Sequence, residues 1–201
     1  SSTNTVYPVI ENNVFWENSD TAIQLAGRAT VRNNILSVAP GKYAYQLGRD
    51  DVLTSDYNAI WLPNGGRVFR REMLPVPAIY ETVGAWSSAS GQDLHSFDSD
   101  PLLANPTAKD FHLKSQMGRL IPGTGAWTND AVSSPLIDAG WPGASAWTNE
   151  LEPNGRRVNI GPHGGTWEAS KSSTNSAVYL LTLNRGGVAS GQVALNWQAA
   201  G

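Results

Sequence analysis

The sequence predicts an all-β fold, and within that class a right-handed parallel β-helix of about four to six coils with a loop-rich C-terminal cap and a terminal β-hairpin. The first observation is a motif of two asparagines flanked by apolar residues, at 10–15, which returns at 31–36. The second is a strand-like segment at 22–25 that returns at 44–47. The third is a composition rich in glycine (20) and poor in charge (15%), which favours strands and turns. Two different motifs that recur at 21–22 residues indicate stacked coils with at least two strands each.

Asparagine marks the predicted bend of successive coils, at Asn12-Asn13, Asn33-Asn34 and Asn58. We expect the flanking aliphatic residues, such as Val14 and Ile35, to fill the interior of the stack. Each asparagine side chain is then placed to bond its equivalent in the next coil. The alternative is that asparagine is simply frequent in turns.

The predicted β-helix and its cap occupy residues 1–168, with an excursion at 62–92 that carries a short helix. Ile79, Val83 and Trp86, spaced as on one helix face, predict that helix, with Thr82 as a cap and Gly91 as a stop. Residues 104–168 are rich in proline, glycine and tryptophan, and we expect them to cover the C-terminal end of the stack, because open strand edges pair with other chains.

The last part of the chain predicts a separate unit. Residues 169–177 are serine-rich and predict a linker. Residues 178–201 predict two strands around a glycine pair, which form a β-hairpin, a truncated β-sandwich or strands docked on the β-helix. At its N-terminal end the stack has no predicted cover, so we expect further domains of a longer parent chain, or another chain, to pack there.

Charge and apolar patterning exclude several partners. The net charge of −3 and the lack of a basic cluster argue against nucleic acid. No apolar run approaches the roughly 20 residues of a membrane span, so no membrane insertion is expected. The chain has no cysteine, which excludes disulfides and thiolate metal sites.

Two clusters are candidate binding sites. Arg67, Arg70 and Arg71 in the excursion, with Trp61 nearby, predict a glycan-binding surface, because loops on a rigid scaffold tend to carry function. The alternative is that these arginines tie the excursion to the scaffold.

A second cluster, Asp50, Asp51 and Asp56, offers oxygen ligands for Ca²⁺, which is the one cofactor that the sequence suggests. Turn capping by the same carboxylates is the alternative. His95, His112 and His163 lack metal-ligand spacing, and His112 is expected to face outward or to cap a coil. The catalytic residues, if any exist, are unknown.

Three further motifs, at 111–116, 134–140 and 153–161, follow the asparagine repeats in the same chain. Together they resemble secreted bacterial right-handed parallel β-helix repeat proteins of the pectate-lyase-like superfamily, over roughly residues 9–170. The tail from Leu183 resembles the start of an immunoglobulin-like module of bacterial surface proteins. Trp141 departs from the family pattern, which has Asp there, and Pro162-His163 stand where Ala-Tyr is usual.

This resemblance implies a secreted or cell-surface bacterial protein in carbohydrate surroundings, with a polysaccharide as the expected partner. The lack of a convergent catalytic set in the repeats favours a non-catalytic extracellular module for scaffolding, adhesion or glycan binding. One alternative is the C-terminal part of a polysaccharide lyase or glycoside hydrolase whose catalytic coils lie upstream. Another is an assembly module that pairs through an open β-helix end.

Overall fold

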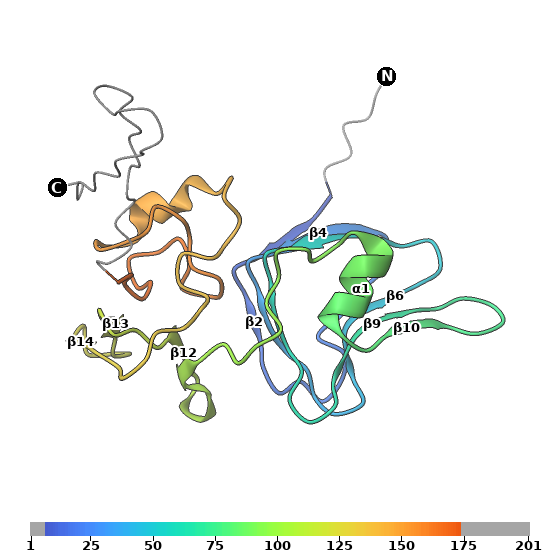
Figure 1. The fold of residues 1–201 in the computed structure, drawn as a ribbon, viewed down its shortest axis with the longest axis horizontal. Helices are drawn as coiled ribbons and strands as arrows, with labels where there is room; N and C mark the ends of the chain where they lie inside the picture. The colour runs from blue at the N-terminus through green and yellow to red at the C-terminus, as the bar shows by residue number, and fades with distance from the viewer. Residues whose placement is uncertain (1–6, 174–201) are drawn as a thin grey trace, which may run out of the picture.

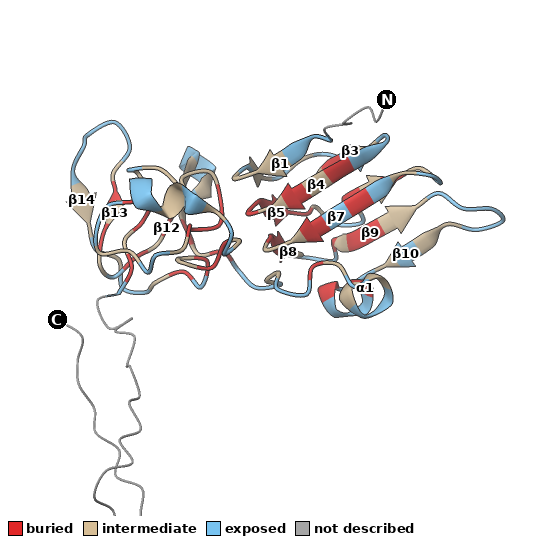
Figure 2. Cartoon of the chain, turned by 90° about the horizontal axis from the view of Figure 1, so that it is seen from above, coloured by how far each residue is buried: buried red, intermediate tan, exposed pale blue. Residues whose placement is uncertain are grey.

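Three parallel sheets form the N-terminal half of the protein (Figures 1 and 2). The computed structural model describes residues 7–173. Within them the chain runs three times through the same three strands, so the described part holds three repeats where four to six coils were predicted. The first sheet contains β1 (Val9–Glu11), β4 (Arg28–Arg32) and β7 (Val52–Asp56); the second contains β2 (Val14–Phe15), β5 (Ile35–Ser37) and β8 (Ala59–Trp61); the third contains β3 (Ile23–Leu25), β6 (Tyr43–Leu47) and β9 (Arg67–Arg71).

Strand pairing follows the sequence repeat. Ile10 pairs with Val31 across β1 and β4, and Ile23 pairs with Tyr45 across β3 and β6. The spacings of 21 and 22 residues therefore correspond to one passage through all three sheets. Figure 2 shows the strands of successive repeats side by side.

The bend between the first and second strand of each repeat has one conformation. Asn12, Asn33 and Tyr57 occupy equivalent positions and all have a left-handed backbone, with φ of 55°, 56° and 57°. This region suits asparagine better than other residues with a side chain. The next residue in each repeat forms the predicted asparagine contacts: Asn13 donates to Asn34 (3.1 Å) and Asn34 to Asn58 (3.1 Å).

An apolar core fills the space between the three sheets. Its fully buried members include Val31, Leu36, Tyr45 and Ile60. Helix α1 (Val83–Ser90) closes this core at its far end, where Trp86 stacks on Phe69 with ring centroids 3.9 Å apart (Figure 1). The helix is capped by Thr82 and ends at the left-handed Gly91, as predicted.

The expected excursion at 62–92 is shorter than predicted. Residues 67–71 form β9, a regular strand of the third sheet, because Val68 and Phe69 are buried in the core. The departure from the repeat starts after β9, where β10 (Ala78–Tyr80) pairs antiparallel with it. The arginines of this stretch therefore lie on a sheet and not in a loop.

Residues 98–173 form a loop-rich C-terminal region beside the sheets. It contains two antiparallel pairs, β11 (Leu103–Asn105) with β12 (Asp110–Leu113), and β13 (Arg119–Leu120) with β14 (Trp127–Thr128). It also contains two short 3₁₀ helices, η1 (Pro106–Ala108) and η2 (Ser145–Asn149).

The prediction that residues 104–168 cover the C-terminal end of the stack is wrong, because these residues lie beside the stack. They pack on the outer face of the second sheet, where Leu113, Leu136 and Ile160 form a second core with Ile35 and Ala59. Ile35 was expected inside the stack but faces this second core, because its neighbour Leu36 already points inward. The end of the stack is instead covered by α1 (Figure 2).

The first residues of the predicted linker, 169–172, lie against the C-terminal region. Ser170 Oγ donates to the backbone oxygen of Leu113 (2.6 Å), and the Lys171 backbone nitrogen donates to Gly118 (2.8 Å). Residues 174–177 of that linker and the predicted hairpin at 178–201 lie outside the described residues. Across residues 7–173, no helix has the length and apolar character needed to cross a membrane.

Candidate functional site

Two tryptophans meet at one level of the second sheet. Ser37 pairs with Trp61, and Trp16 directly follows Phe15, which pairs with Leu36, so Trp16, Ser37 and Trp61 lie at equivalent positions of three repeats. With strands about 4.8 Å apart, the two tryptophan backbones are separated by roughly 10 Å, with the serine between them. The small serine leaves room for the two indoles to lean together, and their ring centroids are 5.3 Å apart at 28°.

An open groove surrounds this tryptophan pair. Its volume is about 370 Å³, within the range of small-molecule sites. The walls come from the loops that follow β2, β5 and β8, which stack because the repeats stack. The lining residues are Trp16, Glu17, Asn18, Ser19, Ser37, Val38, Ala39, Pro40, Trp61, Pro63 and Asn64.

The polar side chains of the groove are free to bind. Within residues 7–173, the side chains of Glu17, Asn18, Ser19 and Asn64 form no hydrogen bond or ion pair with one another or with their surroundings. Glu17 is the one charged residue among these lining residues. The neighbouring Asp20 lies off the groove, and its pKa is lowered by the backbone N–H of Thr21 and by Lys42.

The C-terminal region supports the groove from behind. Phe111 of β12 contacts Trp16, with ring centroids 6.2 Å apart and tilted by 52°. Trp16 is therefore held between Phe111 and Trp61, which fixes the orientation of the indole before any ligand arrives.

Another aromatic surface lies on the outer face of the first sheet, but its rings are occupied. A depression of about 180 Å³ is lined by Tyr57 and Trp141, among others. The Arg32 guanidinium lies 3.8 Å from the Trp141 ring centre, and Tyr57 stacks on His95 at 4.9 Å. The charged side chains of this depression are also engaged, Arg32 with Glu11 and Asp56 with His95, whereas the polar side chains of the groove are not, so the Trp16–Trp61 groove is the better candidate.

The four residues predicted to bind glycan are not brought together. Trp61 lies in the groove, whereas Arg67, Arg70 and Arg71 lie on β9 in a different sheet. Arg67 contacts the Tyr43 hydroxyl (3.1 Å) and Glu81 (3.5 Å). Arg70 pairs with Glu72 (2.8 Å), and Arg71 donates to the Asp51 backbone oxygen (3.0 Å). These contacts agree with the alternative prediction, in which the arginines tie this segment to the scaffold.

The aspartates predicted to bind Ca²⁺ lie at opposite ends of a strand. Asp50 and Asp51 precede β7 and Asp56 ends it, a separation of roughly 16 Å at about 3.3 Å per residue. Asp51 accepts backbone N–H bonds from Gly27 and Gly48, both 2.6 Å, so it caps a turn. Asp56 accepts from the His95 backbone (2.8 Å) and contacts the His95 ring (2.8 Å).

One cluster of titratable residues was missed by sequence reasoning. His112 of β12 is buried, contrary to expectation, and its ring stacks on His163. Glu168 lies beside this pair. Two features of the sequence could have indicated this cluster. Asp110 lies two residues before His112, and position 163 holds a histidine where the family that the chain resembles usually has tyrosine.

Comparison with known proteins gives one partial match. A family model described as disaggregatase related matches residues 72–140, which is 69 of the 201 residues. The matched segment runs from the end of β9 through α1 and β14 to Gly140, so it includes His112 and excludes the tryptophan groove. No curated protein and no solved structure matches the chain.

Proposed function

We propose that this protein is a non-catalytic module that binds polysaccharide in the Trp16–Trp61 groove, on a scaffold that is part of a right-handed parallel β-helix. The observation that carries the proposal is the stacked tryptophan pair at an open groove with four unengaged polar side chains. An extracellular setting, where polysaccharides are abundant, is part of the proposal.

The β-helix part of the proposal is supported by the strand topology. Three parallel sheets each take one strand from every repeat, and the registers follow a spacing of 21–24 residues. The stack continues beyond the third repeat, where Phe97 bridges to Ala59 in parallel and accepts a hydrogen bond from Ile60 (2.7 Å).

The groove has the chemistry that a sugar ring requires. The faces of aromatic rings carry partial negative charge, which attracts the C–H groups on the apolar face of a pyranose. The hydroxyl groups around the ring need donors and acceptors, which the amides of Asn18 and Asn64 and the hydroxyl of Ser19 supply. Because the charged lining residue is a carboxylate, Glu17, we propose an uncharged glycan and not an acidic one.

Binding is favoured over hydrolysis at this groove. Glycoside hydrolases use a pair of carboxyl groups about 5–9 Å apart. Within the described residues, the groove lining supplies one carboxylate, Glu17. The alternative of a polysaccharide-degrading enzyme would therefore need catalytic residues elsewhere in a longer chain.

The test is affinity electrophoresis of the purified chain through gels that contain neutral or acidic polysaccharides. We expect at least one neutral polysaccharide to retard the protein, and Trp61→Ala to weaken that binding by tenfold or more, about 1.4 kcal/mol. The matched control is Trp167→Ala, because Trp167 is a tryptophan with 53% exposure that lies outside the groove.

Two results would contradict the proposal. One is a chain that no polysaccharide retards. The other is Trp61→Ala binding as tightly as the unchanged protein. Asn64→Ala supplies a check on folding, because Asn64 is an exposed rim residue whose loss leaves the core intact and is still expected to weaken binding.

A further inference from the structure

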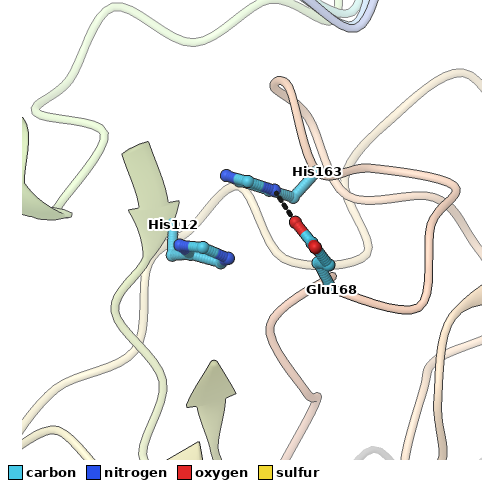
Figure 3. A group of neighbouring side chains, drawn as sticks. All are labelled: His112, His163 and Glu168. Carbon is cyan, nitrogen blue, oxygen red and sulfur yellow. Dashed lines mark ion pairs between the residues drawn. The ribbon is translucent and has the colours of Figure 1, made fainter. Parts of the chain in front are cut away.

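A histidine pair joins two distant segments of the C-terminal region. His112 comes from β12 and His163 from the loop after Ile160, and their rings stack at 3.7 Å with an angle of 9°. Figure 3 shows the two rings one over the other, with the Glu168 carboxylate beside them. His163 Nδ1 lies 3.2 Å from Glu168 Oε2.

The His112 ring is held in one orientation. Its Nδ1 lies 2.6 Å from Asp110 Oδ1, and the other oxygen of Asp110 pairs with Arg119 (3.3 Å). In the tautomer with its proton on Nδ1, the His112 ring donates to the Asp110 carboxylate. The Nε2 atom of His112 then carries a lone pair and no proton.

That Nε2 atom is buried without a partner. The His112 side chain is 4% exposed, and its Nε2 has no hydrogen bond to any described residue. A buried polar atom without a partner costs free energy. A carboxylate on Nδ1 with a free Nε2 lone pair is the arrangement that orients histidine ligands in metal sites.

We propose that His112, His163 and Glu168 bind a zinc-type divalent metal ion that joins β12 to the 161–170 loop. One ligand atom from each residue lies within 4.8 Å of the other two. Two imidazoles and one carboxylate are a known zinc donor set, with the fourth position left for water, and imidazole favours Zn²⁺ over Ca²⁺ or Mg²⁺.

Binding requires a small movement of one ring. Lone pairs lie in the ring planes, and the two planes are nearly parallel, so a single ion cannot lie in both planes at once. Ligand atoms around a tetrahedral zinc ion are roughly 3.4 Å apart, given bonds of about 2.1 Å, so the cluster also has to contract. His163 and Glu168 are the residues that adjust, since their side chains are 26% and 37% exposed while His112 is fixed.

The cluster has a path to solvent. The exposed parts of the His163 and Glu168 side chains open one side of it. Zn²⁺ would meet the Glu168 carboxylate directly, and the Asp110 carboxylate lies behind His112.

The experiment is calorimetric titration of the full 201-residue chain, stripped with a chelator, with Zn²⁺, Ca²⁺ or Mg²⁺. We expect one equivalent of Zn²⁺ to bind and the other two ions to give no saturable heat. At a free Zn²⁺ concentration 100 times the Kd, the melting temperature should rise by roughly 5–10 °C.

Three variants localise the site. His163→Tyr keeps an aromatic ring stacked on His112 but removes the ligand, and should weaken binding by more than 100-fold. Asp110→Asn should weaken it by about 10–100-fold, as expected for a residue behind the ligand. His95→Ala should bind normally, because the third histidine of the chain lies against Asp56, away from the cluster.

The proposal is overturned if the unchanged chain binds no Zn²⁺, if His163→Tyr binds it as tightly as the unchanged chain, or if His95→Ala abolishes binding. The visible spectrum of the Co²⁺ form adds a readout that does not depend on stability. A tetrahedral spectrum in the unchanged chain that is lost in His163→Tyr supports the site; an octahedral spectrum in both contradicts it.

Discussion

Asn58 connects the second repeat, the third repeat and the segment after α1 through one side chain. Its Oδ1 accepts from the backbone and side-chain nitrogens of Asn34, at 3.0 and 3.1 Å. Its Nδ2 donates to Val31, Asp56 and Asp93. The residue is completely buried, so none of these partners can turn to water when the side chain is lost.

The asparagine row ends on Ser96, which stands opposite Asn58, and on the buried carboxylate of Asp93. Asp93 accepts from Asn58, Ser55 and Ser96, and from the Trp86 indole. Burial raises the pKa of Asp93, and these donors oppose the rise. A carboxylate suits this end position because it accepts bonds from several sides and needs no further repeat to donate to.

Asn58→Ala is expected to destabilise the protein by about 2–4 kcal/mol, because it leaves several buried polar groups without partners. Asn13→Ala, at the exposed end of the same row, is expected to cost less than about 1 kcal/mol. Urea unfolding of both variants measures the difference. Equal losses at the two positions would show that burial does not set the strength of these bonds.

Helix α1 is the element that closes the stack. Its interior side is made by Val83 and Trp86, and Trp86 both stacks on Phe69 and donates its indole N–H to Asp93 (3.0 Å). The helix is only eight residues long, too short to be stable alone, so it depends on this packing. The same side chain therefore anchors the helix and satisfies the end of the asparagine row.

Trp86→Ala should cost about 3–5 kcal/mol, as is typical when a large buried aromatic side chain is removed. Trp86→Phe keeps the ring contact with Phe69 and loses the N–H donor, so a smaller cost of about 1–3 kcal/mol is expected. Thr82→Ala is the matched control for the helix itself, with about 1 kcal/mol from loss of the cap. Thermal or urea unfolding gives all three values, and a Trp86→Ala cost no larger than that of Thr82→Ala would mean that α1 does not close the core.

At the scale of the whole molecule, the second sheet lies between two cores. Leu36 faces the core between the sheets, and Ile35 faces the core made with the C-terminal region. The first asparagine of each bend completes this contact: Asn33 Oδ1 accepts from Trp141 (2.7 Å), and Asn12 Nδ2 donates to Gly164 (2.8 Å). Gly161 passes so close to Ile35 that a Cβ on it would lie 2.6 Å from the Ile35 Cδ1 atom.

Glu150 makes the stability of the molecule depend on pH. Its carboxylate accepts backbone N–H bonds from Asn159 (2.9 Å) and Gly165 (2.7 Å) inside the C-terminal region. Burial raises the pKa of Glu150 from 4.5 to about 7, against the effect of these two bonds. Because the folded pKa is above the unfolded value, the contribution to stability is complete below pH 4.5 and is lost as the pH rises through about 7.

Glu150→Gln should remove this pH dependence, since the amide oxygen can accept the same two bonds without ionising. The rise of the Glu150 pKa from 4.5 to about 7 corresponds to roughly 3 kcal/mol, so the free energy of unfolding of the variant should exceed that of the unchanged protein by about that amount at pH 8.5 and match it at pH 4.5. Denaturant unfolding at the two pH values measures it. A constant difference between the two proteins at both pH values would rule out ionisation of Glu150 as the cause.

Periodic features were predictable because they depend on the spacing of like residues. The pairing of β1 with β4 and of β3 with β6, and the bonds from Asn13 to Asn34 to Asn58, all follow from segments that repeat. The caps of α1 were also predictable, since Thr82 and Gly91 act on their own neighbours. The strand at 67–71 was not predictable from the sequence. Two of its five side chains are apolar and three are arginines, and this pattern also suits a loop.

The sequence by itself determined the stacking of β1 on β4, of β2 on β5 and of β3 on β6, since a repeat of 21–22 residues places equivalent backbone groups opposite one another. The tertiary structure decided what lies outside the repeat: the tryptophan pair over Ser37, the use of Asn12 and Asn33 to hold the C-terminal region, and the contact of His112 with His163. The physical reason is that these contacts join segments that share no spacing, so they exist only once two cores have packed on the same sheet.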